Sequence, residues 1–150
     1  MPSYLGVESI VYEATDSAGF GPGSNEAGIV IYKIGTYSYN NIKNGGADYL
    51  NKQIPPLDEQ GRRTRKYHWN VTPGNFCAIK PRPQEQHSSR CSSDALSFAG
   101  AYLPSFSPPK NLVDIANSAI NSPGNYYAYF RSAFIILDMD NRYAIFVYSG

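Results

Sequence analysis

Thirteen tyrosines are spread along this chain of 150 residues, together with 13 glycines and 11 prolines. Tyrosine favours strands that are buried on one face, whereas glycine and proline mark turns and interrupt helices. Short strands joined by turn-rich connections are therefore expected. The tyrosine ring is also a flat contact surface that carries a polar hydroxyl, which suits binding. The composition predicts a mainly β protein in which some aromatic rings face solvent near the loops.

The overall composition excludes several classes of protein. With 42% hydrophobic and 17% charged residues, the chain is too apolar for a disordered protein. The net charge is only +1, so the chain lacks the strong positive field of a protein that packages DNA or binds anionic membranes. The length fits one globular domain over residues 1–150. No apolar run reaches the about 18 residues that a membrane-inserted helix needs.

The first residues, 1–7, lack the basic and apolar regions of a signal peptide. We expect either a cytoplasmic location or export without a cleavable signal, for example in a secreted or virion-borne assembly. The sequence leaves the location open.

The first third of the chain has the pattern of a hairpin. Apolar and polar residues alternate over residues 5–13, and a second strand pattern covers residues 29–34. Residues 14–28 between them are rich in glycine and are expected to form a long flexible connection. Tyr37 and Tyr39 extend the second strand pattern until asparagines and glycines interrupt it.

The middle of the chain is predicted to be mostly irregular. Residues 51–66 are polar and have no hydrophobic period, so they are expected to be exposed. Tyr67, Trp69 and Val71 then alternate with polar residues, which predicts a short strand, with residues 76–79 as its partner.

The last third has the strongest patterns. Apolar residues at helical spacing predict a helix over residues 112–120, capped by Asn111 and stopped by Pro123 and Gly124. A weaker helix pattern covers residues 94–102. Two nearly continuous apolar runs, residues 133–137 and 143–148, predict a hairpin in the middle of a sheet, because both of its faces are apolar.

These elements predict the fold class. We expect a single antiparallel β-sandwich or irregular barrel with one or two short helices on one side, and an α+β arrangement is the close alternative.

Reactive side chains gather between residues 62 and 91. Metal-independent RNA cleavage needs a base, an acid and cations for the phosphate. The candidates for these roles are His68, His87, Lys80 and Arg90. Spacing alone does not bring the two histidines together, and the ordinary alternative is that all four lie on surface loops. A nucleic acid is expected as partner only if the ribonuclease hypothesis holds.

Cys77 and Cys91 are candidates for a disulfide. Redox surroundings decide between a disulfide and free thiols, so the sequence leaves both open. Together with His68 and His87 they are the right residue types for zinc, but no closely spaced pair such as Cys-x2-Cys is present. No metal and no cofactor is predicted. The glycine-rich residues 19–28 are not followed by the Gly-Lys-Ser/Thr of a phosphate loop.

Asp138 and Asp140 would share a face in an extended segment and could then bind a divalent cation. Their position between two apolar runs, directly before Asn141, favours a hairpin turn instead.

The aromatic residues in or beside loops rich in asparagine, serine and glycine are the candidate binding residues. Such a mixture combines rigid contact area with adaptable hydrogen bonding. The set consists of Tyr37, Tyr39, Tyr67, Trp69, Tyr126, Tyr127 and Tyr129. The alternative is that these rings fill the rim of the core, with only the hydroxyl in water.

The absence of a catalytic motif favours a recognition module that binds a surface glycan or a protein partner. Two other hypotheses stay open. One is a small secreted toxin or ribonuclease that uses His68 and His87, and the other is a structural subunit that forms homo-oligomers through its tyrosine-bearing strands.

Overall fold

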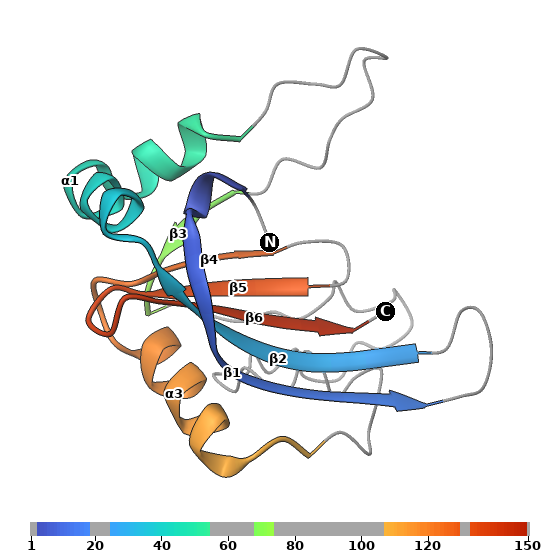
Figure 1. Cartoon of the computed structure of the whole chain (residues 1–150). Helices are drawn as coiled ribbons and strands as arrows, with labels where there is room; N and C mark the ends of the chain where they lie inside the picture. Colours follow the sequence, from blue (N-terminus) through green and yellow to red (C-terminus); the bar gives the residue numbers. More distant parts are fainter. Residues whose placement is uncertain (1–2, 19–24, 55–67, 74–106, 130–132, 150) are drawn as a thin grey trace, which may run out of the picture.

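The computed structural model describes residues 3–18, 25–54, 68–73, 107–129 and 133–149. In these ranges, six strands form one antiparallel sheet in the order β1-β2-β6-β5-β4-β3 (Figure 1). The elements are η1 (Ser3–Leu5), β1 (Val7–Ala18), β2 (Asn25–Ile34), α1 (Thr36–Lys52), β3 (Asn70–Val71), α3 (Lys110–Asn121), β4 (Tyr126–Tyr129), β5 (Ala133–Asp138) and β6 (Tyr143–Ser149).

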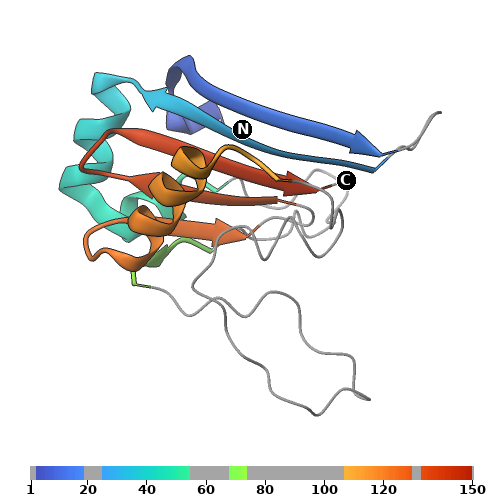
Figure 2. The same cartoon turned by 90° about the horizontal axis from the view of Figure 1, so that it is seen from below.

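The two helices cover opposite faces of the sheet, as Figures 1 and 2 show together. Leu112 and Ile120 of α3 belong to a core cluster with Ile31. On the other face, Ile42 and Leu50 of α1 belong to a second cluster. The prediction of a mainly antiparallel β protein with short helices is confirmed. The strands form a single sheet with one helix on each side, which corresponds to the α+β alternative.

The β5–β6 hairpin lies in the middle of the sheet, as predicted. Every residue of β5 is buried. Phe134 is opposite Val147 and Ile136 is opposite Ile145 in the β5–β6 register. Side chains of β5 enter both core clusters, which is why a helix is needed on each face.

The predicted flexible connection over residues 14–28 is mostly wrong. Strand β1 continues to Ala18 and β2 begins at Asn25, so regular pairing occupies most of this segment. Thr15 is opposite Gly28, which is in turn opposite Tyr148 of β6. A Cβ atom on Gly28 would lie 2.5 Å from Cε1 of Tyr148. Gly28 is therefore part of the sheet, where its missing side chain makes room for the Tyr148 ring.

Helix α1 replaces the strand extension that was predicted at Tyr37 and Tyr39. Ser38, Ile42 and Leu50 are buried at helical spacing, so tertiary packing determines the structure of this segment. Gly46 has φ +58° and ψ −151°, which interrupts the helix with a kink. The alternation of tyrosines with polar residues resembled a strand only over a short window.

The helix predicted over residues 112–120 is confirmed as α3. The predicted cap is wrong, because Pro109 occupies the N-cap position and no side chain caps the helix there. Asn111 lies inside the first turn, and its side chain is exposed. The helix ends with Ser122 as its C-cap, directly before Pro123 and Gly124, as predicted.

Strand β3 is shorter than the alternation around Trp69 suggested, and it pairs with β4, where Asn70 is opposite Tyr127. The partner predicted at residues 76–79, the helix predicted at residues 94–102 and most of the polar connection at residues 51–66 lie outside the described residues.

Candidate functional site

Two of the predicted binding aromatics are core residues. Trp69 is 1% exposed, and its indole Nε1–H donates a hydrogen bond to the Tyr4 hydroxyl at 3.0 Å. Tyr127 is 9% exposed, and its ring packs edge-on against Tyr129 with centroids 5.9 Å apart. The expectation that these two rings face solvent is wrong, because each belongs to one of the core clusters.

The other tyrosines of this set have mixed positions. Tyr126 and Tyr129 lie within β4, not in a loop, and both are partly buried. Burial, followed by the neighbouring Tyr127, raises the pKa of the Tyr129 phenol. Tyr67 lies outside the described residues.

Among the described members of the predicted binding set, Tyr37 is the most open to solvent, with 81% of its surface exposed. On helix α1 it is followed at helical spacing by Asn40, Asn41 and Asn44, so one face of the helix carries an aromatic ring and three amides. These four residues are called the Tyr37 face below.

Tyr39 lies beside two cations near the start of α1. Lys43 Nζ is 5.9 Å and Arg142 Cζ is 5.3 Å from the centre of its ring. One Nη of Arg142 donates to the Ile34 carbonyl at 3.0 Å and to Thr36 Oγ1 at 2.9 Å. This guanidinium therefore joins the β5–β6 turn to the end of β2 and the start of α1.

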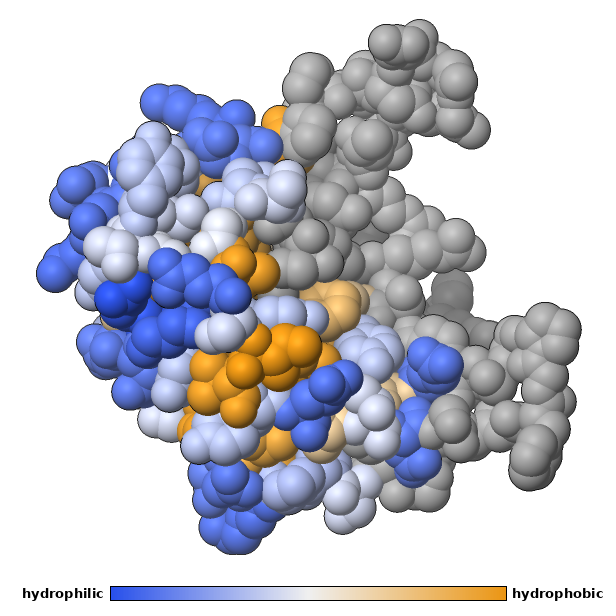
Figure 3. All heavy atoms as spheres, viewed as in Figure 1, coloured by the Kyte–Doolittle hydropathy of each residue, from blue (hydrophilic) through white to orange (hydrophobic). Residues whose placement is uncertain are grey.

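The longest edge of the sheet belongs to β1, which has 12 residues. Strand β2 pairs with one side of β1, and no other described strand lies along its outer side. A strand edge of this kind presents N–H and C=O groups that have no partner in the sheet. Ile10 and Tyr12 are 55% and 43% exposed. Figure 3 shows an apolar area of the surface over this strand.

The two halves of β1 differ in regularity. Its register against β2 shifts between Val7 and Ser9 and again between Ile10 and Tyr12. From Tyr12 to the end of the strand the pairing is continuous. Bulges protect strand edges from further pairing, so residues 12–18 form the regular part of the edge. This part is called the β1 edge below.

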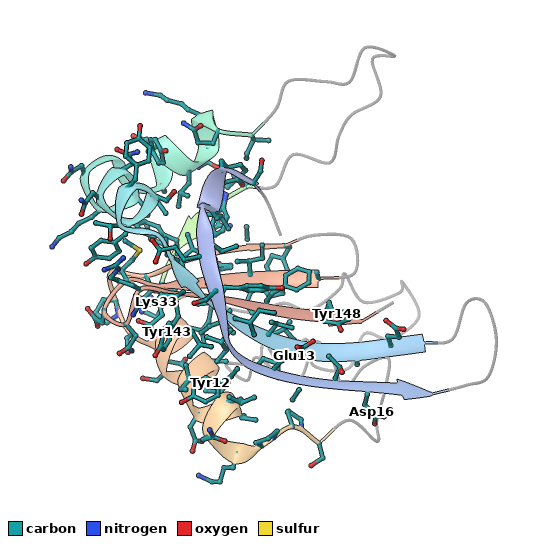
Figure 4. All side chains as sticks on the ribbon, viewed as in Figure 1. Tyr12, Glu13, Asp16, Lys33, Tyr143 and Tyr148 are labelled. Carbon is teal, nitrogen blue, oxygen red and sulfur yellow. The ribbon has the colours of Figure 1, made fainter. Side chains whose placement is uncertain are left out.

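An acidic hollow lies beside the β1 edge. Its volume is about 370 Å³, and it is lined by Glu13, Thr15, Asp16, Glu26 and Tyr148. The labelled side chains of β1 and Tyr148 can be followed in Figure 4. Burial is the main cause that raises the pKa of the Tyr148 phenol, and the charges of Glu26 and Glu13 raise it further.

Sequence reasoning missed this acidic surface, although a signal for it exists. The first 32 residues contain four charged side chains, and all of them are acidic: Glu8, Glu13, Asp16 and Glu26. The first lysine is Lys33, whose Nζ lies 4.9 Å from the centre of the Tyr143 ring and donates to the Asn141 carbonyl at 2.9 Å.

The predicted catalytic residues are hardly covered by the structure. His68 is exposed. The other candidates, His87, Lys80 and Arg90, lie outside the described residues, as do Cys77 and Cys91. Both the ribonuclease hypothesis and the disulfide therefore stay predictions.

The described part of the chain contains no group of three or more His, Cys, Asp or Glu residues arranged for a metal ion. The turn interpretation of Asp138 is confirmed. Its Oδ1 accepts hydrogen bonds from the backbone N–H groups of Asp140 at 3.1 Å and Asn141 at 3.0 Å. Its Oδ2 accepts a third from the Asn141 side chain at 2.8 Å.

Comparisons with protein-family models, with curated proteins and with solved structures give no match for this chain. Neither α1 nor α3, the helices of the described residues, has the length and apolar character that crossing a membrane requires. Function is therefore inferred from the Tyr37 face, the β1 edge and the acidic hollow.

Proposed function

We propose that this protein is a recognition module for a protein partner, and that the partner adds an extended segment to the β1 edge. The observation that carries this proposal is the combination of continuous pairing from Tyr12 onward with an outer side that no described strand covers. Strand addition of this kind is a general mode of peptide recognition.

Two physical terms support binding at this edge. An added strand pairs with N–H and C=O groups of β1, and each such hydrogen bond contributes about 0.5–1.5 kcal/mol net. The same strand covers apolar surface of Tyr12, which is 43% exposed. Backbone pairing supplies affinity for many sequences, and side chains beside the strand supply the selection among them.

The proposal is tested with the full chain and an array of immobilised ten-residue peptides, followed by amide hydrogen exchange with the best binders. We expect that amides of β1 become protected on binding, while those of β4 do not change. Tyr12→Lys should weaken binding. The matched control is Val71→Lys on the opposite edge, since Val71 is also apolar and 62% exposed. Protection that appears away from β1, or full binding by Tyr12→Lys, contradicts the proposal.

The Tyr37 face supports a second candidate, which is recognition of a glycan. Sugar rings stack on exposed aromatic faces, and the side-chain amides of Asn40, Asn41 and Asn44 can donate and accept hydrogen bonds to hydroxyl groups. A glycan array probed with the wild type and with Tyr37→Ala tests this candidate, with Tyr12→Ala as control. Binding that Tyr37→Ala leaves unchanged removes it.

A further inference from the structure

We infer that the segment bound at the β1 edge is basic, with lysine or arginine alternating with apolar residues. The inference rests on the proposed function, because it names the chemistry of the partner for that same edge. It is carried by the charges beside the strand and by the two faces that the strand presents.

Before Lys33, near the end of β2, the charged side chains of the first two strands are all acidic. Glu8, Glu13, Asp16 and Glu26 are exposed, and no lysine or arginine occurs in the described residues before Lys33. Among the described residues, one ion pair is present, and it joins Lys110 and Asp114 on α3. None of the four carboxylates therefore forms an ion pair with a described residue. The edge therefore presents negative charge that a cationic segment would neutralise.

The same charges argue against a second copy of this chain as the occupant. Symmetric pairing of two β1 strands would bring Glu13 and Asp16 of both copies within a few residues of one another. Like charges on neighbouring strands are destabilising, and at physiological salt repulsion acts over about 8 Å. A partner strand of opposite charge avoids this cost.

The two faces of the β1 edge select different side chains. Glu13 and Thr15 lie on the face shared with Tyr148, because Thr15 is opposite Gly28 and Gly28 is opposite Tyr148. Tyr12 lies on the other face, since it is opposite Ile31 of the cluster that contains α3.

Successive side chains of an added strand point to these two faces in turn. Every second residue therefore lies on the face of Glu13, where a lysine or arginine can pair with this carboxylate. The residues between them lie on the face of Tyr12 and Asp16, where the exposed Tyr12 ring favours apolar side chains.

Three ten-residue peptides with alternating Lys/Val, Ser/Val and Glu/Val test the inference by fluorescence anisotropy with the full chain. We expect Lys/Val to bind most tightly and Glu/Val to bind least. Added salt should weaken the binding of Lys/Val but not that of Ser/Val. The double variant Glu13→Gln, Asp16→Asn should lower Lys/Val affinity about fivefold, a larger loss than for Ser/Val. The matched control is Asp48→Asn, which removes an exposed carboxylate from α1 instead.

The outcomes separate this inference from the proposed function. Equal binding of all three peptides, with protection of β1 amides, overturns the charge inference and supports the edge as a binding site. If none of the three peptides binds, and no peptide of the array protects the β1 amides, both the charge inference and the proposed function are overturned. A dimer detected by sedimentation, in which β1 amides are protected, overturns the inference in favour of a second copy.

Discussion

The side-chain oxygen of Asn125 accepts a hydrogen bond from the backbone N–H of Met139 at 2.8 Å. The side-chain nitrogen of the same residue donates to the Ala119 carbonyl at 2.8 Å, and its backbone N–H donates to Thr72 Oγ1 at 3.1 Å. Asn125 is 2% exposed. Through its side-chain amide and its backbone N–H, this buried residue joins the end of α3, the residue after β3 and the turn that follows β5.

Asn125→Ala is expected to destabilise the protein by about 2–4 kcal/mol, because it leaves the Met139 N–H and the Ala119 carbonyl buried without this partner. Urea unfolding followed by circular dichroism measures the change. Asn111→Ala is the control. Since Asn111 does not cap α3, its removal should change stability by less than about 0.5 kcal/mol. A small effect of Asn125→Ala would mean that water replaces the amide.

Asp138→Ala is expected to cost about 2–3 kcal/mol, because three hydrogen bonds to this buried carboxylate hold the β5–β6 turn. Asp138→Asn retains one oxygen and should cost less. Thermal unfolding of the three proteins measures the order. A rise in Tm of the wild type on addition of Ca²⁺ or Mg²⁺, absent in Asp138→Ala, would favour the cation hypothesis over the turn.

Trp69 is the single tryptophan of the chain, so intrinsic fluorescence reports on its surroundings alone. Because the side chain is 1% exposed, we expect blue-shifted native emission that iodide hardly quenches, and a red shift on unfolding. Peptides that bind at the β1 edge should leave the emission unchanged. Strong iodide quenching of the folded protein would contradict the buried position.

Stability is expected to fall in strong alkali. The folded state raises the pKa of Tyr127, Tyr129 and Tyr148, mainly through burial, so above about pH 10 the unfolded chain loses these protons first. Below that pH both states keep the protons, and these groups contribute no pH dependence. Tyr129→Phe should flatten the decline above pH 10, as measured by urea unfolding between pH 8 and 12. An unchanged slope would contradict this role of Tyr129.

The best sequence predictions concerned elements whose surroundings are implied by their own composition. The apolar runs around Ile136 and Ile145 are apolar on both faces, so only the middle of a covered sheet accommodates them. Helix α3 was predictable because Leu112, Ala116 and Ile120 repeat at helical spacing over its whole length.

The failures have a different physical origin. In α1 only a few core residues, such as Ile42 and Leu50, mark the buried side, and asparagines and glycines between them hide the period. Tyrosine and tryptophan suit both core and surface, so the sequence does not distinguish buried Trp69 from exposed Tyr37. The acidic edge was missed because the order of strands, which exposes β1, depends on contacts between distant segments.

The two rims of the sheet are unequal in the described part of the chain. One rim is the edge strand β1, with 12 residues, and the other is the edge strand β3, with 2 residues. A filament that grows by strand pairing needs a receptive rim at both ends of every subunit. Here the short rim gives an incoming strand little to pair with, so an assembly built on the long rim should stop after one addition, with one-to-one stoichiometry.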